Sequence, residues 1–427
     1  MLKDGFHVSL DRFSSWVPEE DCCKWKGVGC NNETGHVITL DLHSPDPSEL
    51  LQGELRDSLV HLPYLSYLDL SLNDFCQTQI PEFIGSLSNL KYLNLPRANF
   101  RGNIPCHLGN LSSLQTLDLS NNQFSLGLAA LTGVRTQSMV PSLVELRLFS
   151  CQLHNLPQSL PSLNFSCLEV LDLSYNGFYH SLIPNWLVEV SHTLRVLNFR
   201  TCWLQHSIAH AIVNFTSLAV LDLSYNSLTG SFPQYFGNLT SLYVLDFSHN
   251  NLMDSIPHDF GNMTSLVVLD LSFNDLEGPL PATLGHHFKH SPLRELYLSD
   301  NFLTQLSLEK ILPQLSELVV LDVAGNYLNG VITEAHLQNF TRLKLVWRDT
   351  SILAELHKFG CPGSWEKCTI WEHTDMAGGK FQESAGDFVA SQCFGRKYTS
   401  AALPIETLKL PGLLFQFIIR TNSTLHT

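Results

Sequence analysis

One short pattern recurs, with variations, twelve times between Leu40 and Leu328, and it constrains the fold more than any other feature. Two clear copies are LAVLDLSYNSL, beginning at Leu218, and LVVLDLSFNDL, beginning at Leu266. Both have the form L-x-x-L-x-L-x-x-N-x-L, and successive copies lie 24 to 29 residues apart. A single unit of this length cannot bury its own leucines, whereas a stack of such units forms a continuous core.

The L-x-L triplet of each copy predicts a short strand, because alternate strand residues point to opposite faces of a sheet. We expect the leucines to face the interior of the stack and the residues between them to face solvent on its concave side. The asparagine that follows is expected to bond backbone groups of its own turn and of the next coil. Cys151 and Cys202 replace this asparagine in two copies, and Pro45 and Ala98 replace it in two others. We interpret both cysteines as buried thiols.

Several copies continue with a glycine and a proline, as in LTGSFP from Leu228 and LEGPLP from Leu276. Glycine permits a tight turn, and proline favours an extended or 3₁₀ path over a long helix. This continuation resembles the L-x-G-x-I-P extension of plant-type leucine-rich repeats. The expected fold is of the α/β class, a right-handed leucine-rich-repeat solenoid. Its concave face is expected to carry a parallel β-sheet, and its convex face mostly 3₁₀ helices and loops.

Residues 16–30, before the first copy, read WVPEEDCCKWKGVGC. This segment resembles the amino-terminal cap of plant extracellular leucine-rich-repeat receptors, whose pattern is W…D-C-C-x-W-x-G-V-x-C. The resemblance implies a disulfide between Cys23 and Cys30, with Trp25 filling the core beneath the cap. The alternative is a zinc site, but a second pair of ligands is absent nearby. Family members carry another cysteine upstream to pair with the position of Cys22, so we expect Cys22 to be unpaired.

The cap and the repeats, from about Phe13 to Leu345, together resemble the ectodomain of plant leucine-rich-repeat receptor-like proteins. The resemblance is to the immune-receptor type related to the receptors for fungal xylanase. It implies recognition of a secreted peptide or protein ligand in defence or developmental signalling, with a receptor kinase as co-receptor of the full-length protein. It also implies an extracellular or plasma-membrane location. A signal peptide and a membrane anchor are not recognisable in this chain.

Three regions are expected: a cap at residues 1–35, a solenoid at 36–346 and a poorly ordered, non-repeat tail at 347–427. The solenoid would hold about twelve repeats and a broken thirteenth, which loses the pattern after Leu345. We interpret the chain as a receptor fragment whose tail arises from an altered splice, a frameshift or a gene model. The alternative is a genuine short soluble form with a terminal domain of its own, which Cys361 and Cys368 could staple.

Charge and motif content argue against nucleic-acid binding and catalysis. The chain has 25 basic and 40 acidic residues, and the resulting net charge of −15 disfavours a phosphate-binding surface. The sequence contains no G-x-S-x-G, H-E-x-x-H or kinase motif. His286, His287 and His290 lack acidic or cysteine partners at ligand spacing, so we interpret them as a solvated loop. We therefore expect a protein that is not an enzyme and needs no metal or other cofactor.

Sequons for N-linked glycosylation favour an extracellular history, although each one alone is a weak signal. Glycans at these sites would coat the convex or flanking side and leave the concave face open. The predicted sites are Asn32, Asn110, Asn164, Asn214, Asn238, Asn262 and Asn339, and an eighth sequon lies at Asn422.

The concave face is the expected ligand-binding site. An aspartate recurs between the two leucines, so we interpret it as part of the scaffold. Specificity is expected from aromatic and basic residues that break the repeat, because these residue types dominate interface energetics. The alternative is that Tyr175, Tyr225 and Phe273 only pack on neighbouring coils as an aromatic spine. The candidate ligand-binding residues are Tyr92, Arg97, Arg147, Phe149, Tyr175, Arg200, Tyr225, His249, Phe273 and Tyr297.

Two functions fit such a surface. The first is the ligand-recognition ectodomain of a receptor-like protein. The second is a secreted inhibitor of a microbial cell-wall-degrading enzyme, as in the polygalacturonase-inhibiting proteins, whose repeats this sequence also resembles. Those inhibitors are shorter and have a closing, cysteine-bearing cap. Twelve irregular copies without a recognisable closing cap therefore favour the receptor.

Overall fold

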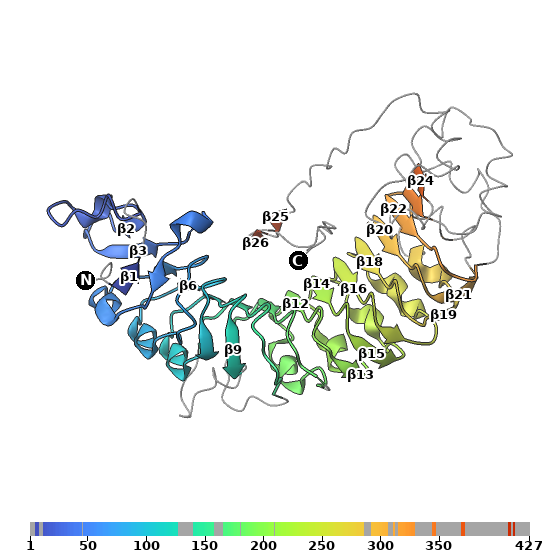
Figure 1. The fold of residues 1–427 in the computed structure, drawn as a ribbon. Helices are drawn as coiled ribbons and strands as arrows, with labels where there is room; N and C mark the ends of the chain where they lie inside the picture. The colour runs from blue at the N-terminus through green and yellow to red at the C-terminus, as the bar shows by residue number, and fades with distance from the viewer. Residues whose placement is uncertain are drawn as a thin grey trace, which may run out of the picture.

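The computed structural model describes residues 5–328, apart from gaps at 8–11, 45, 127–139, 158–164, 180, 209, 286–291, 306–310 and 312–314. Beyond residue 328 it describes four short strands. The described coils stack along an arc (Figure 1), with the long sheet on the inner side. The predicted disorder of the tail, the histidine cluster from His286 to His290, and the sequons at Asn164, Asn339 and Asn422 lie outside the described residues.

The twelve copies form twelve parallel strands of a single sheet, which confirms the predicted solenoid. Neighbouring strands pair in register, so that Leu221 lies opposite Leu245, and Leu245 opposite Leu269. The strands are β3 (Val37–Asp41), β5 (Tyr67–Asp69), β6 (Tyr92–Asn94), β8 (Thr116–Asp118), β10 (Glu145–Arg147), β11 (Val170–Asp172), β12 (Val196–Asn198), β14 (Val220–Asp222), β16 (Val244–Asp246), β18 (Val268–Asp270), β20 (Glu295–Tyr297) and β22 (Val320–Asp322).

Three further strands extend this sheet at its two ends. At the N-terminal end, β2 (Val28–Cys30) of the cap pairs antiparallel with β3. At the other end, β23 (Lys344–Val346) pairs parallel with β22, as expected for the broken thirteenth copy. The next strand, β24 (Thr369–Trp371), pairs parallel with β23 although no repeat pattern predicts it. The strand β24 therefore shows that pairing continues past the end of the recognisable repeat.

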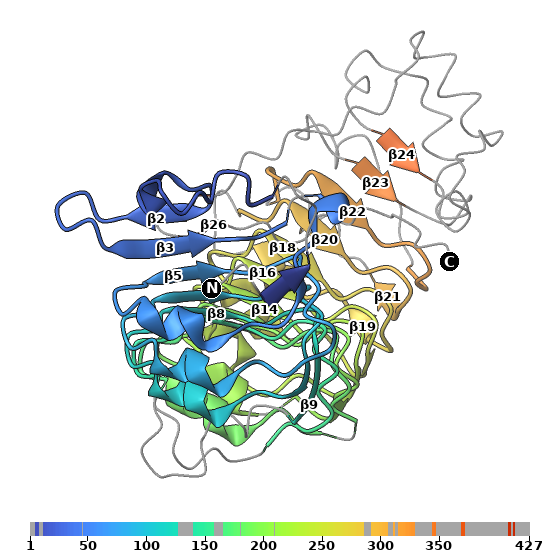
Figure 2. The same cartoon turned by 60° about the vertical axis from the view of Figure 1, so that its left-hand side comes forward.

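Where the outer side of a coil is described, it carries short 3₁₀ helices, as predicted, and Figure 2 shows them stacked along the edge away from the sheet. Prolines Pro81, Pro105, Pro184 and Pro257 cap four of these helices, where a fixed φ and a missing N–H cost nothing. Among the described residues, no helix has the length and apolar character that crossing a membrane requires. The helices are η4 (Asp57–His61), η5 (Glu82–Ser86), η6 (Cys106–Asn110), η8 (Asn185–Val190), η9 (His210–Asn214), η10 (Phe236–Asn238), η11 (His258–Asn262) and η12 (Ala282–Gly285).

The glycine of the L-x-G-x-I-P extension lies in a second set of short strands that follows the asparagine turn. Gly102, Gly230 and Gly278 have φ values of 96°, 79° and 79°, in the region that side chains rarely adopt. These strands pair between coils as β7–β9, β13–β15–β17 and β19–β21. Their bounds are β7 (Arg101–Asn103), β9 (Gln123–Leu126), β13 (Gln205–His206), β15 (Ser227–Gly230), β17 (Asn251–Leu252), β19 (Glu277–Pro279) and β21 (Phe302–Gln305).

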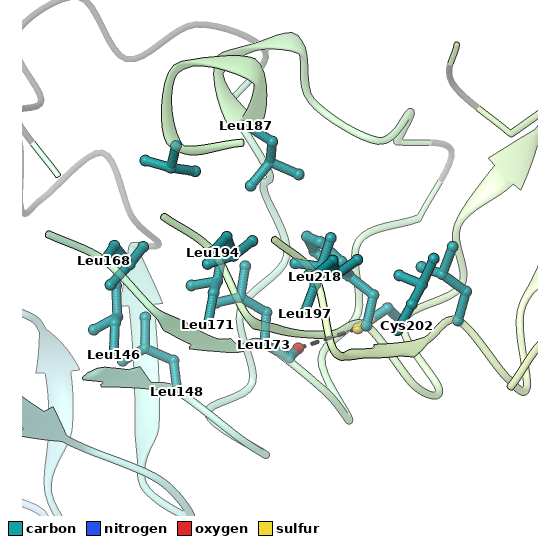
Figure 3. Close-up of a cluster of buried hydrophobic side chains, with 14 of the residues drawn as sticks. Leu146, Leu148, Leu168, Leu171, Leu173, Leu187, Leu194, Leu197, Cys202 and Leu218 are labelled. Atoms are coloured by element: carbon teal, nitrogen blue, oxygen red, sulfur yellow. Dashed lines mark hydrogen bonds between the residues drawn. The ribbon is translucent and has the colours of Figure 1, made fainter. Parts of the chain in front are cut away.

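The leucines of successive coils form one continuous core. Figure 3 shows Leu146, Leu171 and Leu197 from three neighbouring strands lying side by side, and all three are fully buried. Because each coil contacts mainly its neighbours, the core is built by stacking and not by long-range collapse.

A column of asparagines closes the turns after the strands, as predicted, but it bonds the preceding coil and not the next one. In each case the side-chain amide donates to backbone carbonyls of its own turn and of the preceding coil. Asn250 Nδ2, for example, donates to the carbonyls of Leu223, Phe247 and Ser248, and Asn250 Oδ1 accepts the amide of Leu228. The column comprises Asn73, Asn122, Asn176, Asn226, Asn250, Asn274, Asn301 and Asn326.

Cys151 and Cys202 take the asparagine position in two coils and are buried free thiols, as predicted. Each thiol donates to the carbonyl that an asparagine would reach: Cys151 to Leu119 at 3.2 Å and Cys202 to Leu173 at 3.1 Å. Figure 3 shows the second of these bonds. Burial raises the pKa of both thiols, which keeps them protonated and able to donate.

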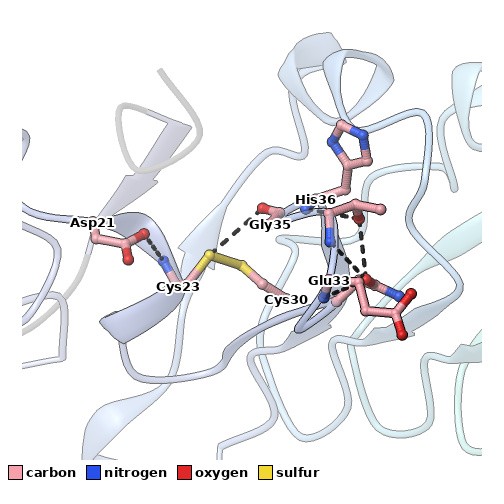
Figure 4. Close-up of a disulfide and its surroundings, with 8 residues drawn as sticks. Asp21, Cys23, Cys30, Glu33, Gly35 and His36 are labelled. Atoms are coloured by element: carbon pink, nitrogen blue, oxygen red, sulfur yellow. Dashed lines mark hydrogen bonds between the residues drawn. A yellow bond between two sulfur atoms is a disulfide. The ribbon is translucent and has the colours of Figure 1, made fainter.

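The cap contains the predicted disulfide between Cys23 and Cys30 (Figure 4), and Cys22 is a free thiol. Trp25 differs from its predicted role, because it is only half-buried and stacks on Trp16 with ring centroids 5.0 Å apart. Trp16 is the buried ring. The cap therefore covers the first coil with a pair of stacked indoles.

Candidate ligand-binding face

Six of the ten predicted ligand-binding residues form one continuous row of side chains across six neighbouring coils. The rings of Tyr225 and His249 stack at 4.0 Å, and those of His249 and Phe273 at 4.2 Å. The guanidinium carbon of Arg200 lies 4.5 Å from the centre of the Tyr225 ring. At the other end, Phe149 meets Tyr175 edge-on at 5.2 Å. The "ring row" therefore consists of Phe149, Tyr175, Arg200, Tyr225, His249 and Phe273.

The backbone places four of these side chains in the same way. Tyr175, Tyr225, His249 and Phe273 all precede the turn asparagine and have φ values between 55° and 56°. This left-handed conformation costs roughly 1–2 kcal/mol for a residue with a side chain. Backbone bonds to the next coil hold it, such as those from the Tyr225 amide to Ser248 and from the His249 amide to Ser272. The four side chains therefore project in parallel from a preorganised backbone.

The ring row is partly open to solvent. Tyr175, Tyr225 and Phe273 are 46%, 40% and 40% exposed. They pack on one another, as the aromatic-spine alternative expects, yet the stacking leaves much of each ring uncovered. Exposed aromatic side chains on a rigid backbone often anchor protein interfaces, because they bury a large area on binding at a low cost in conformational entropy.

Arg200 is held by the protein on several sides. Its Nε donates to the Tyr175 hydroxyl at 3.2 Å, and Nη1 donates to Ser224 Oγ at 2.9 Å. Nη1 also lies 3.8 Å from Asp246 Oδ2 and 4.0 Å from Asp222 Oδ2. These contacts tie Arg200 to the coils on both sides of its own. It is therefore a structural member of the ring row as well as a candidate contact.

The other four predicted residues do not join the ring row. Tyr92 stacks on Tyr67 with centroids 4.5 Å apart, near the N-terminal end of the sheet. Arg97 is exposed on that part of the concave side. Two others bond a glutamate on their own strand: Arg147 pairs with Glu145 at 3.2 Å, and Tyr297 donates to Glu295 at 3.0 Å.

Most copies of the repeated aspartate are buried and do not face solvent, so for these copies the prediction is wrong; Asp41 and Asp118 are half-buried. Asp222 and the serine two residues later, Ser224, are both buried. The reason is local, because Asp222 Oδ1 accepts both the amide and the hydroxyl of Ser224, at 3.0 and 2.6 Å. The same arrangement occurs at Asp172 and Asp270. The aspartate thus stabilises the turn that follows its strand, which agrees with its interpretation as scaffold.

One further cluster of possible metal ligands lies at the N-terminal end of the sheet, where no ligand motif in the sequence predicts it. Side-chain donor atoms of Asp41, His43 and Asp69 lie within 4.8 Å of one another. They already have partners, because His43 Nδ1 lies 2.6 Å from Asp41 Oδ1 and Asp69 accepts from Asn94 and Ser71. The His43 ring here takes the place of the serine hydroxyl that bonds the aspartate in other coils.

The sequon asparagines that the structure describes are all exposed. Four of them, Asn110, Asn214, Asn238 and Asn262, are the last residues of 3₁₀ helices on the outer side of the coils. The fifth, Asn32, lies in the cap. Glycans at these positions would leave the ring row uncovered.

Comparison with protein families identifies the cap and the repeats. A leucine rich repeat N-terminal domain matches residues 1–31, and leucine rich repeats match residues 113–133, 167–189 and 214–276. The matching families describe repeats and their cap, and none of them describes an enzyme.

Curated relatives are plant receptor-like proteins. The chain is 39% identical over 228 residues to receptor-like protein EIX1 of Solanum lycopersicum, which covers 45% of this chain and 22% of that protein. It is 43% identical over 115 residues to receptor-like protein 50 of Arabidopsis thaliana, covering 26% and 12% of the two chains. The chain thus spans less than a quarter of the length of these relatives.

Solved structures also share this fold. A TDR receptor structure has a TM-score of 0.60 at 26% identity and covers 73% of this chain and 56% of its own. The PEPR1–AtPEP1 structure has a TM-score of 0.60 at 26% identity, with coverage of 81% and 53%. The chain is therefore a leucine-rich-repeat protein whose cap and repeats are similar to those of plant receptor-like proteins.

Proposed function

We propose that this chain is the extracellular recognition part of a plant receptor-like protein and binds a secreted peptide or protein ligand along the ring row. The observation that carries the proposal is the continuity of the ring row. It combines exposed aromatic rings with a fixed cation over neighbouring coils. A long, rigid concave face suits an extended ligand, because binding then requires little ordering of the protein.

The comparisons support this proposal through the proteins they match. EIX1 is a receptor-like protein, and the PEPR1–AtPEP1 structure shares the fold of this chain. Recognition in defence or development, a receptor kinase as co-receptor and glycosylation of the outer helices belong to the same proposal. The exposed asparagines on the outer side are consistent with it, since glycans there would not block the concave face.

Substituting two exposed rings of the ring row should abolish most ligand binding without unfolding the chain. The double variant Tyr225→Asn, Phe273→Asn keeps a residue type that tolerates positive φ, so the fold should persist. We expect at least about tenfold weaker binding, because central aromatic anchors carry more than 1 kcal/mol each. Binding is measured on immobilised parent and variant chains, with purified fungal xylanase as the protein probe and a displayed random-peptide library as the peptide probe.

Tyr235→Asn provides the matched control. Tyr235 is also an exposed tyrosine with positive φ, but it precedes helix η10 on the outer side. This variant should bind like the parent. If the probes that bind the parent bind the double variant equally well, the ligand site does not lie on the ring row.

A further inference from the structure

Three buried aspartates lie side by side beneath the ring row. Asp222, Asp246 and Asp270 come from the neighbouring strands β14, β16 and β18, and they are in register. All three are buried. Arg200 is the cation that the structure places beside the first two. Like charges at strand spacing repel one another strongly when they are removed from water.

Another copy of the repeated aspartate shows how its second carboxylate oxygen can find a hydrogen-bond donor. Asp69 Oδ2 accepts the side-chain amide of Asn94 from the next coil at 2.6 Å. At Asp222 the next coil contributes Asp246, whose ionised carboxylate can only accept. Asp222 Oδ2 is buried and has no hydrogen-bond partner. The Arg200 nitrogen, at 4.0 Å, is beyond hydrogen-bond distance. A donor is therefore missing at this position, and a buried polar atom without one is costly.

We propose that Asp222 keeps a proton next to the carboxylate of Asp246, and that this proton fixes the position of Arg200 within the ring row. A proton on one carboxyl supplies the missing donor and halves the negative charge next to Arg200. Arg200 then stays with the Tyr175 hydroxyl, Ser224 and the Tyr225 ring. When the proton leaves, two carboxylates attract one guanidinium that lies within 4.0 Å of both. We expect Arg200 to move toward them and away from the ring row.

The electrostatics of the site agree with this geometry. Burial first, and then the charge of Asp246, raise the pKa of Asp222 to about 7, while Ser224 and Arg200 oppose the increase. Burial likewise raises the pKa of Asp172 on β11. The charged groups next to the pair are Arg200, within 4.0 Å of both carboxylates, and Asp270, the register neighbour of Asp246. Tyr175 and Tyr225 contact Arg200, and His249 stacks on Tyr225. Asp172 lies two strands away, on the other side of Asn198.

The sign of the pH dependence follows from this increase. The folded-state pKa of Asp222 lies above the value of about 3.9 for an unfolded aspartate. The folded chain therefore holds an additional proton between about pH 4 and pH 7. The stability that this proton provides is complete below the window and is lost as the pH rises through about 7.

Thermal unfolding from pH 5 to pH 8 tests the Asp222 proton on the full chain without any ligand. The parent should melt several degrees lower at pH 7.5 than at pH 5.5. Asp222→Asn supplies an amide donor like that of Asn94, so it should melt higher than the parent at pH 7.5 and show a smaller pH dependence. Asp254→Asn removes an equal charge from an exposed site and should follow the parent. An unchanged pH dependence in Asp222→Asn would overturn the proposal.

The role of Arg200 is tested by Arg200→Gln. Removing the cation should strengthen proton binding by Asp222, so the melting temperature of this variant should continue to fall to a higher pH than in the parent. A midpoint at the parent's pH would show that Arg200 is not coupled to the carboxyl pair. Any effect of this proton on ligand binding rests on the proposed function. Because the melting assay contains no ligand, failure of the ring row as a binding site and failure of the Asp222 proton are distinguishable.

Discussion

Replacing Leu221 with aspartate is expected to unfold the central coils at room temperature. Leu221 is fully buried between Leu197 and Leu245 of the neighbouring strands. Removing a buried leucine side chain costs about 2–5 kcal/mol, and an unpaired buried carboxylate adds several kcal/mol more. The sum is comparable with the whole stability of a typical domain, which is about 5–15 kcal/mol. Circular dichroism and thermal melting would measure the loss.

The matched control is Thr229→Asp in the same coil. Thr229 is exposed on β15, so its substitution should change stability by no more than about 0.5 kcal/mol. An equal loss of melting temperature in the two variants would mean that the strand register is not the one observed.

Replacing Asn250 with alanine is expected to cost about 2–4 kcal/mol, because it removes four buried hydrogen bonds at once. The carbonyls of Leu223 and Phe247 would lose the donor that Asn250 provides, and the amide of Leu228 would lose its acceptor. Such losses are severe where water cannot enter, and Asn250 is buried. Chemical denaturation of the parent and the variant gives the difference in the free energy of unfolding.

Its neighbour Asn251 provides a control of identical chemistry. The Asn251 side chain is exposed, whereas its backbone amide and carbonyl take part in the second strand layer. Asn251→Ala should therefore cost less than about 1 kcal/mol. If both substitutions cost the same, the asparagine column would not be what closes the turns.

The solenoid could be predicted from the sequence because every coil has the same short-range structural requirements. The buried leucines, the asparagine that closes each turn and the proline that starts the 3₁₀ helix occur in phase. Each is a short-range requirement that a single copy already shows. The thiols of Cys151 and Cys202 were predictable for the same reason, since a position in the repeat determined their environment.

The candidate site was predictable only in part, because it depends on which side chains meet across coils. The rings that break the repeat could be named, but the sequence does not show that Tyr225, His249 and Phe273 stack in a continuous series. Nor does it show that Arg200 turns toward Asp222 and Asp246 instead of toward solvent. The burial of these aspartates was missed because the alternation along a strand predicts only the face toward which a side chain points. It does not predict how far the neighbouring coils cover that side chain.

Oxidative footprinting of aromatic side chains tests the central claim most directly. The parent chain is labelled alone and in complex with whichever probe binds it more tightly, the fungal xylanase or a peptide selected from the displayed library. We predict that ligand protects Tyr175, Tyr225 and Phe273, which are exposed in the free chain, and leaves the oxidation of Tyr235 on the outer side unchanged. Protection of Tyr235 with unchanged labelling of the ring row would contradict recognition on the concave face.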